Sequence, residues 1–90
     1  MAAAYPWLES DSPFIDVKIY APTKPGVRAG IDRVGRYRLE VYYQDADALK
    51  TETAYLTKAG ADALVTLLVE HGFTERDYRH ASHFRRGALA

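Results

Sequence analysis

The chain of 90 residues contains no cysteine, and this absence alone excludes several kinds of site. Disulfide frameworks, thiolate zinc sites, iron–sulfur clusters and cysteine nucleophiles all need the sulfur atom of that side chain. Long apolar runs are missing too, since no stretch approaches the roughly 18 apolar residues that a helix needs to cross a bilayer. We therefore expect a protein that has no contact with a membrane and that fits the reducing cytoplasm.

The first residues also lack the two features of a secretory signal, which are a basic start and an uninterrupted apolar stretch. No basic side chain precedes the short apolar patch, and Pro6 and Glu9 interrupt it. The expected location is therefore cytoplasmic.

The length limits how the chain can be organised. A domain of this size buries only about 60 to 65% of the surface that its unfolded chain exposes, which leaves room for one core. Trp7 and Leu8 are expected to fold back onto that core, because a lone large aromatic ring is costly to leave in water. The sequence thus predicts a flexible N-terminal segment (1–12), a single domain (13–86) and a flexible tail (87–90).

Two segments alternate between apolar and polar residues with the period of a half-buried strand. The first spans 14–21 between two prolines, and the second spans 36–44. The connection at 45–49 is rich in residues that hydrogen-bond their own backbone. This pattern favours a hairpin that leads to a third strand at 50–56.

Beyond the hairpin the spacing changes to that of a helix. Thr57 is suited to cap a helix N-terminus, and apolar residues recur every three or four positions from Ala59 onward. Gly72 with an apolar residue after it is typical of a helix C-terminus. Thr74 then offers a second helix start, so a short C-terminal helix is expected up to about Arg86. The predicted fold class is α+β, with a three-stranded, mostly antiparallel sheet packed by one amphipathic helix and followed by that short helix.

Tyrosine and arginine are the notable candidates for binding. The alternation places Tyr20, Arg38 and Tyr42 on the polar side of the sheet, where Tyr and Arg combine large contact area with a polar group, as in protein–protein hot spots. A second possibility is that these aromatic rings are covered by the loop 22–35 or by the N-terminal segment. The loop is basic, although the net charge of the chain is zero. The candidate partner-binding residues are Tyr20, Arg28, Arg33, Arg36, Arg38 and Tyr42.

No arrangement of residues predicts catalysis. No Ser–His–Asp set follows from the spacing, and neither glycine pattern that holds nucleotide phosphates occurs. His80 and His83 are spaced like metal ligands, but the sequence supplies no convincing fourth ligand, so no metal or cofactor is predicted. The main hypothesis is a small non-enzymatic protein-binding module, in the style of a phage or mobile-element accessory protein that modulates a host protein. Because sheet edges invite pairing, a homodimer formed by strand addition or helix packing is also expected.

Two alternatives belong to other classes. One is a nucleic-acid-binding protein that uses the basic loop 22–38 or the stretch 67–87, which resembles a degenerate helix-turn-helix with Gly72 in the turn. Leu68 stands where that motif usually has a small residue. The other alternative is a small structural subunit of a larger assembly. In the helix-turn-helix hypothesis the residues facing the nucleic acid would be Arg76, Arg79, His80 and His83.

Overall fold

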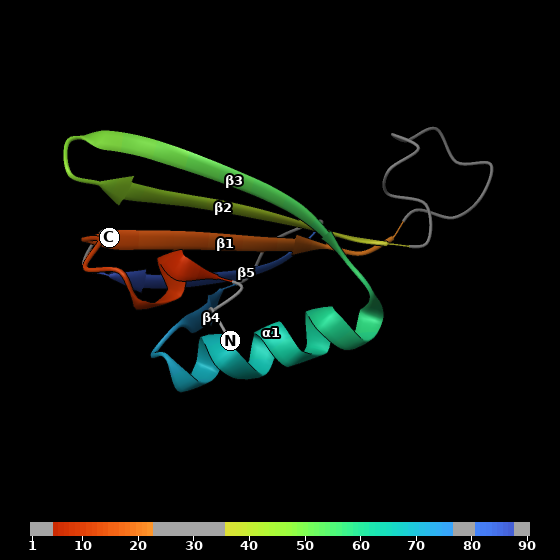
Figure 1. Cartoon of the computed structure of the whole chain (residues 1–90). Helices are drawn as coiled ribbons and strands as arrows, with labels where there is room; N and C mark the ends of the chain where they lie inside the picture. Colours follow the sequence, from red (N-terminus) through yellow and green to blue (C-terminus); the bar gives the residue numbers. More distant parts are fainter. Residues whose placement is uncertain (1–4, 23–35, 77–80, 88–90) are drawn as a thin grey trace.

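The structure, a computed structural model, describes residues 5–22, 36–76 and 81–87. In this part of the chain five strands form one antiparallel sheet in the order β3-β2-β1-β5-β4, and one α-helix lies along one side of it (Figure 1). In chain order the elements are η1 (Pro6–Glu9), β1 (Phe14–Tyr20), β2 (Tyr37–Asp45), β3 (Ala48–Leu56), α1 (Lys58–Glu70), β4 (Thr74–Arg76) and β5 (Ala81–Gly87).

The α+β class is confirmed, but the expected three-stranded sheet is wrong, because the described residues form five strands. The expected short C-terminal helix is also wrong. Its residues 74–76 and 81–87 form β4 and β5, and β5 pairs with β1 from end to end. A short isolated helix is only marginally stable. Pairing with β1 instead satisfies the backbone of β5 and buries Phe84 opposite Val17 in the core.

The hairpin between β2 and β3 is tighter than expected. Its turn consists of two residues, Ala46 and Asp47, and β3 begins directly after them at Ala48. Ala46 has a φ of 55°, in the left-handed region. A positive φ at this place matches the twist of the paired strands in two-residue hairpins.

The ends of α1 follow the predicted capping chemistry. The Thr57 hydroxyl accepts a hydrogen bond of 3.1 Å from the N–H of Gly60 at the N-terminus. At the C-terminus Gly72 has a φ of 85°, and the N–H of Phe73 donates back to the carbonyl of Leu68 over 2.9 Å. This is the glycine-terminated arrangement that closes a helix.

The core lies between the sheet and α1. Ile15, Val17, Ile19, Leu39 and Val41 line the sheet side. Ala61, Leu64 and Leu68 of α1 pack in the same cluster, and so do Phe73 and Phe84.

The N-terminal segment contributes to the core, as expected for its two large apolar side chains. Trp7 and Leu8 are 3% and 5% exposed, and the ring of Trp7 meets that of Phe73 edge-on at 6.5 Å. The Arg86 guanidinium lies over the Phe73 ring and donates to the carbonyls of Leu8, Ser10 and His71. Arg86 therefore links the segment before β1 to the C-terminal end of α1 through hydrogen bonds.

Candidate binding face

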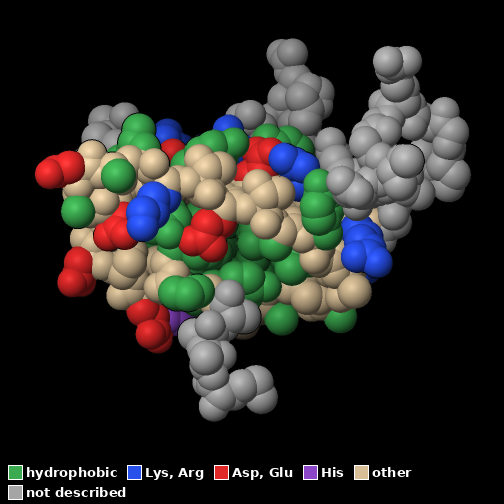
Figure 2. All heavy atoms as spheres, turned by 45° about the horizontal axis from the view of Figure 1, so that its top comes forward, with side chains coloured by type: hydrophobic (Ala, Val, Ile, Leu, Met, Phe, Trp, Pro, Cys, Tyr) green, Lys and Arg blue, Asp and Glu red, His purple; other side chains and the backbone are tan. Residues whose placement is uncertain are grey.

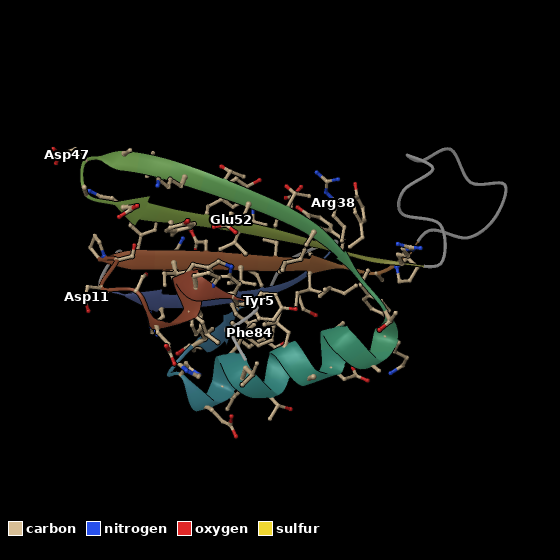
Figure 3. All side chains as sticks on the ribbon, in the orientation of Figure 1. Tyr5, Asp11, Arg38, Asp47, Glu52 and Phe84 are labelled. Carbon is tan, nitrogen blue, oxygen red and sulfur yellow. The ribbon has the colours of Figure 1, made fainter. Side chains whose placement is uncertain are left out.

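The side of the sheet away from α1 carries a row of polar and aromatic side chains. Figure 3 shows Arg38 on this side, whereas Phe84 points toward α1. The strand register brings neighbouring residues of this side together, since Tyr20 pairs with Arg38 and Arg38 pairs with Tyr55. We call its central part the polar face. It comprises Asp16, Lys18 and Tyr20 of β1, Arg38, Glu40 and Tyr42 of β2, Thr51, Thr53 and Tyr55 of β3, and His83 and Arg85 of β5.

The carboxylate of Glu40 connects several side chains of this face. Its Oε2 accepts a hydrogen bond of 2.8 Å from Nε of Arg38, and its Oε1 accepts one of 3.1 Å from the hydroxyl of Tyr42. Partial burial raises the pKa of Glu40, but hydrogen bonds from Arg38, Tyr42 and Tyr20 outweigh that effect, so its pKa is lowered. Glu40 is therefore ionised at neutral pH, and its charge holds three neighbouring side chains.

Two cations lie against tyrosine rings on the same face. The Lys18 ammonium is 5.4 Å from the ring centre of Tyr42. The Arg38 guanidinium is 5.7 Å from the ring centre of Tyr55, and it also donates to the Tyr55 hydroxyl over 2.7 Å. Such contacts fix the orientation of rings that would otherwise rotate in solvent. Burial and the bond to Glu40 raise the pKa of Tyr42, so this phenol keeps the proton that it donates.

A second charged cluster joins β1 to β5. Arg85 donates from Nε and Nη2 to both carboxylate oxygens of Asp16, the second over 3.0 Å. Nε2 of His83, a side chain that is 8% exposed, lies 3.3 Å from the same carboxylate. Burial raises the pKa of Asp16, but the hydrogen bonds from Arg85 and His83 prevail and lower it. This forked pair ties the two strands together.

Three of the predicted binding residues meet on this face. Tyr20, Arg38 and Tyr42 all bond to one carboxylate, that of Glu40. Arg36 is exposed just ahead of β2 and is not part of the sheet. Arg28 and Arg33 lie outside the described residues.

The helix-turn-helix interpretation of 67–87 is wrong, because β4 and β5 take the place of its second helix. Of its four residues, Arg76 is exposed on β4. His83 is buried beside Asp16, where it cannot face a groove. Arg79 and His80 lie outside the described residues.

Several members of the polar face were not among the residues predicted from the sequence. Alternation along the first two strands already places Asp16, Lys18 and Glu40 on the side of Tyr20, so the strand pattern could have found them. The same alternation in the third strand would have found Tyr55. Arg85 was missed for another reason, since its segment was expected to be helical.

A shallow hollow of about 420 Å³ lies away from this face, beside the β2–β3 turn. Acidic side chains gather at that end of the molecule, at the left of Figure 2. Two of its polar residues have partners within the chain, since Asp45 pairs with Lys50 over 2.8 Å and Ser12 Oγ accepts from the N–H of Gln44 over 3.1 Å. The hollow is lined by Ser10, Asp11, Ser12, Pro13, Tyr43, Gln44, Asp45 and Ala46.

The described residues contain no group of three or more His, Asp or Glu side chains that could hold a metal ion together. No helix within the same ranges has the length and apolar character needed to span a bilayer. In comparisons with known proteins, no family model, curated protein or solved structure matches the chain.

Proposed function

We propose that this chain is a small non-enzymatic protein-binding module, and that its polar face contacts the partner protein. The observation that carries the proposal is the shared carboxylate of Glu40, which holds Arg38, Tyr42 and Tyr20 in place. Arg and Tyr dominate the energetics of protein interfaces, because each brings a large surface together with a polar group. Side chains that are ordered before binding lose less conformational entropy when a partner arrives.

The balance of charge on the face favours a protein over a nucleic acid. The guanidinium of Arg38 is compensated by Glu40, and that of Arg85 by Asp16. Binding to a phosphate backbone draws its energy from cations that neutralise phosphates and release counterions. Guanidiniums already matched by carboxylates serve that purpose poorly, whereas mixed charges suit a protein surface of complementary pattern.

The exposure of the face supports the same proposal. Tyr42 is 36% exposed although its hydroxyl and its ring both have partners within the chain. Thr51 and Thr53 on the neighbouring strand are exposed as well. A partner that covers this area would bury an aromatic ring already held in one orientation, which is how hot-spot residues act.

The experiment is affinity capture with tagged protein from lysate of the source organism, with and without nuclease. Wild type is compared with the double variant Arg38→Ala, Tyr42→Ala. The matched control is Lys58→Ala, Val69→Ala, which removes one cation and one large exposed side chain from α1 on the other side of the sheet. Circular dichroism confirms that all three proteins fold.

We expect one protein that survives nuclease, is retained by the control and is lost with the double variant. Capture that disappears with nuclease and persists in the double variant would contradict the proposal. That outcome would point to the nucleic-acid alternative. A large assembly captured equally by all three proteins would instead indicate a structural subunit.

A further inference from the structure

β3 forms one edge of the sheet, and its outer side is unpaired by any strand in the described ranges. It is nine residues long, contains no proline, and is exposed from Ala48 to Thr53. The opposite edge, β4, has three residues in the described part of the chain. A long edge strand offers a row of backbone donors and acceptors to another strand, and proteins usually protect such an edge with proline, bulges or charge. β3 lies at the top of Figure 1, and its last residues lead down to α1.

The hairpin turn determines which backbone groups of β3 face outward. In a hairpin with a two-residue turn, the residues that flank the turn form a hydrogen-bonded pair, here Asp45 with Ala48. Hydrogen-bonded and non-hydrogen-bonded pairs then alternate along an antiparallel ladder. The residues whose N–H and C=O groups are directed away from β2 are therefore Leu49, Thr51, Thr53 and Tyr55.

The charges of β3 are arranged so that the strand complements itself. Lys50 and Glu52 flank Thr51, and both lie on the α1 side of the sheet. If two copies of β3 pair antiparallel about Thr51, Lys50 of each copy lies directly opposite Glu52 of the other. Two opposite-charge pairs form in this register, and cross-strand pairs of opposite charge are favourable.

The neighbouring registers lack this match. Pairing about Glu52 would place two carboxylates directly opposite each other, which is destabilising. Pairing about Thr53 would set Lys50 against Leu56 and Glu52 against Ala54, so no charge would be compensated. The charge pattern therefore selects the register that is centred on Thr51.

We propose that β3 is the interface for a second copy of this chain, and that two copies join antiparallel about Thr51 into one continuous sheet. The symmetry is that of a closed pair, in which Lys50 of one copy contacts Glu52 of the other and the reverse contact forms as well. Leu49, which is 76% exposed on the side of the polar face, then lies opposite Thr53 of the other copy. The two polar faces come to lie on the same side. This inference does not depend on what the polar face binds.

Lys50 and Glu52 have partners within the chain, but these contacts do not prevent ion pairs between the two copies. Lys50 pairs with Asp45 over 2.8 Å, and both side chains are about half exposed, at 51% and 57%. An exposed pair of this kind contributes little to stability. Glu52 accepts a hydrogen bond of 2.6 Å from the Tyr43 hydroxyl, and its second oxygen can still accept from a lysine.

The test reverses the charge of Lys50 or of Glu52. Sedimentation equilibrium over a wide range of protein concentration then measures the molecular mass in solution. Wild type is expected to reach twice the chain mass of 10.1 kDa. Lys50→Glu and Glu52→Lys each place like charges opposite each other, so each variant alone is expected to remain monomeric. Mixed together they are expected to restore the dimer, because every cross-strand pair then joins a lysine to a glutamate.

The matched control is Glu75→Lys on β4, the other edge, which should leave the dimer unchanged. Restoration in the mixture also shows that both single variants fold. A wild type that stays monomeric at every concentration would overturn the proposal. Single variants that dimerise as well as wild type, or a mixture that remains monomeric, would also overturn it. None of these results depends on capture of another protein, so this inference and the proposed function can fail separately.

Discussion

Arg38 and Glu40 lie two residues apart on β2 and form an ion pair of 2.8 Å on the side of the sheet away from the helix. Residues at this spacing in a strand share one face, so the short sequence of β2 alone brings the two side chains together. The cross-strand neighbour Tyr20 then joins the same carboxylate, and Tyr55 joins the guanidinium. One ion pair thereby links three strands of the face.

Replacement of Glu40 by glutamine is expected to loosen this face without unfolding the domain. Glutamine keeps the size of the side chain but removes the charge that Arg38 and Tyr42 bond to. A hydrogen bond to a charged group contributes about 1.5 to 3 kcal/mol and a neutral one about 1 kcal/mol, and the glutamine oxygen can still accept, so a loss of about 1 to 2 kcal/mol in the free energy of unfolding is expected. Urea denaturation measures it. A Glu40→Gln variant as stable as wild type would show that the charge of Glu40 contributes nothing to the stability of the fold.

Acid is expected to destabilise the protein through Asp16 and Glu40. Both have folded-state pKa values below their ordinary values of 3.8 and 4.5. Their contribution to stability is therefore complete above those ordinary values, and it is lost as the pH falls through the lower folded-state values. Urea midpoints measured from pH 6 downward should fall below about pH 4.5. In the double variant Asp16→Asn, Glu40→Gln the urea midpoint should depend less on pH. The same pH dependence as in wild type would show that these two carboxylates are not the cause.

Arg86 is expected to be important for stability although it is a charged residue near the C-terminus. It donates to three backbone carbonyls and covers the Phe73 ring. Arg86→Ala should cost about 2 to 3 kcal/mol, since partly buried acceptors lose a charged donor. Arg76→Ala removes an exposed arginine of β4 and should change stability by less than about 0.5 kcal/mol. Equal effects of the two substitutions in thermal or urea unfolding would contradict the role given to Arg86.

Gly87 at the end of β5 is expected to tolerate no side chain. Its φ is 125°, a conformation that residues with a Cβ rarely adopt, and an added Cβ would collide with the carbonyl oxygen of Pro13. Gly87→Ala should therefore destabilise the domain by about 1 to 3 kcal/mol, as strained backbone positions do. Thermal unfolding measures the loss. An alanine variant with an unchanged midpoint would show that the end of β5 does not require glycine.

Much of the fold could be predicted from local pattern. The alternation of β1 and β2, the capping residues Thr57 and Gly72 and the apolar spacing of α1 are properties of short windows, and the structure has these elements close to the expected positions. The position of Tyr20, Arg38 and Tyr42 on one face followed from the same alternation.

The last two strands could not be predicted in this way. The polar residues His83 and Arg85 of β5 lie on the polar face, so β5 shows no simple apolar pattern. Their placement depends on the carboxylate of Asp16, which is 69 residues away from Arg85 in the chain. A short window contains no sign of that partner, and a polar segment that follows a possible cap is indistinguishable from a helix start.

The most direct test of the binding account is site-specific photo-crosslinking in cells of the source organism. A benzophenone amino acid replaces Thr53, which is exposed on the polar face opposite Glu40, in one protein, and Val69, which is 61% exposed on α1, in the control. The account predicts a discrete protein adduct, resistant to nuclease and identified by mass spectrometry as a chain other than this one, from position 53 only. No such adduct at position 53, an adduct to nucleic acid, or equal adducts at both positions would contradict it.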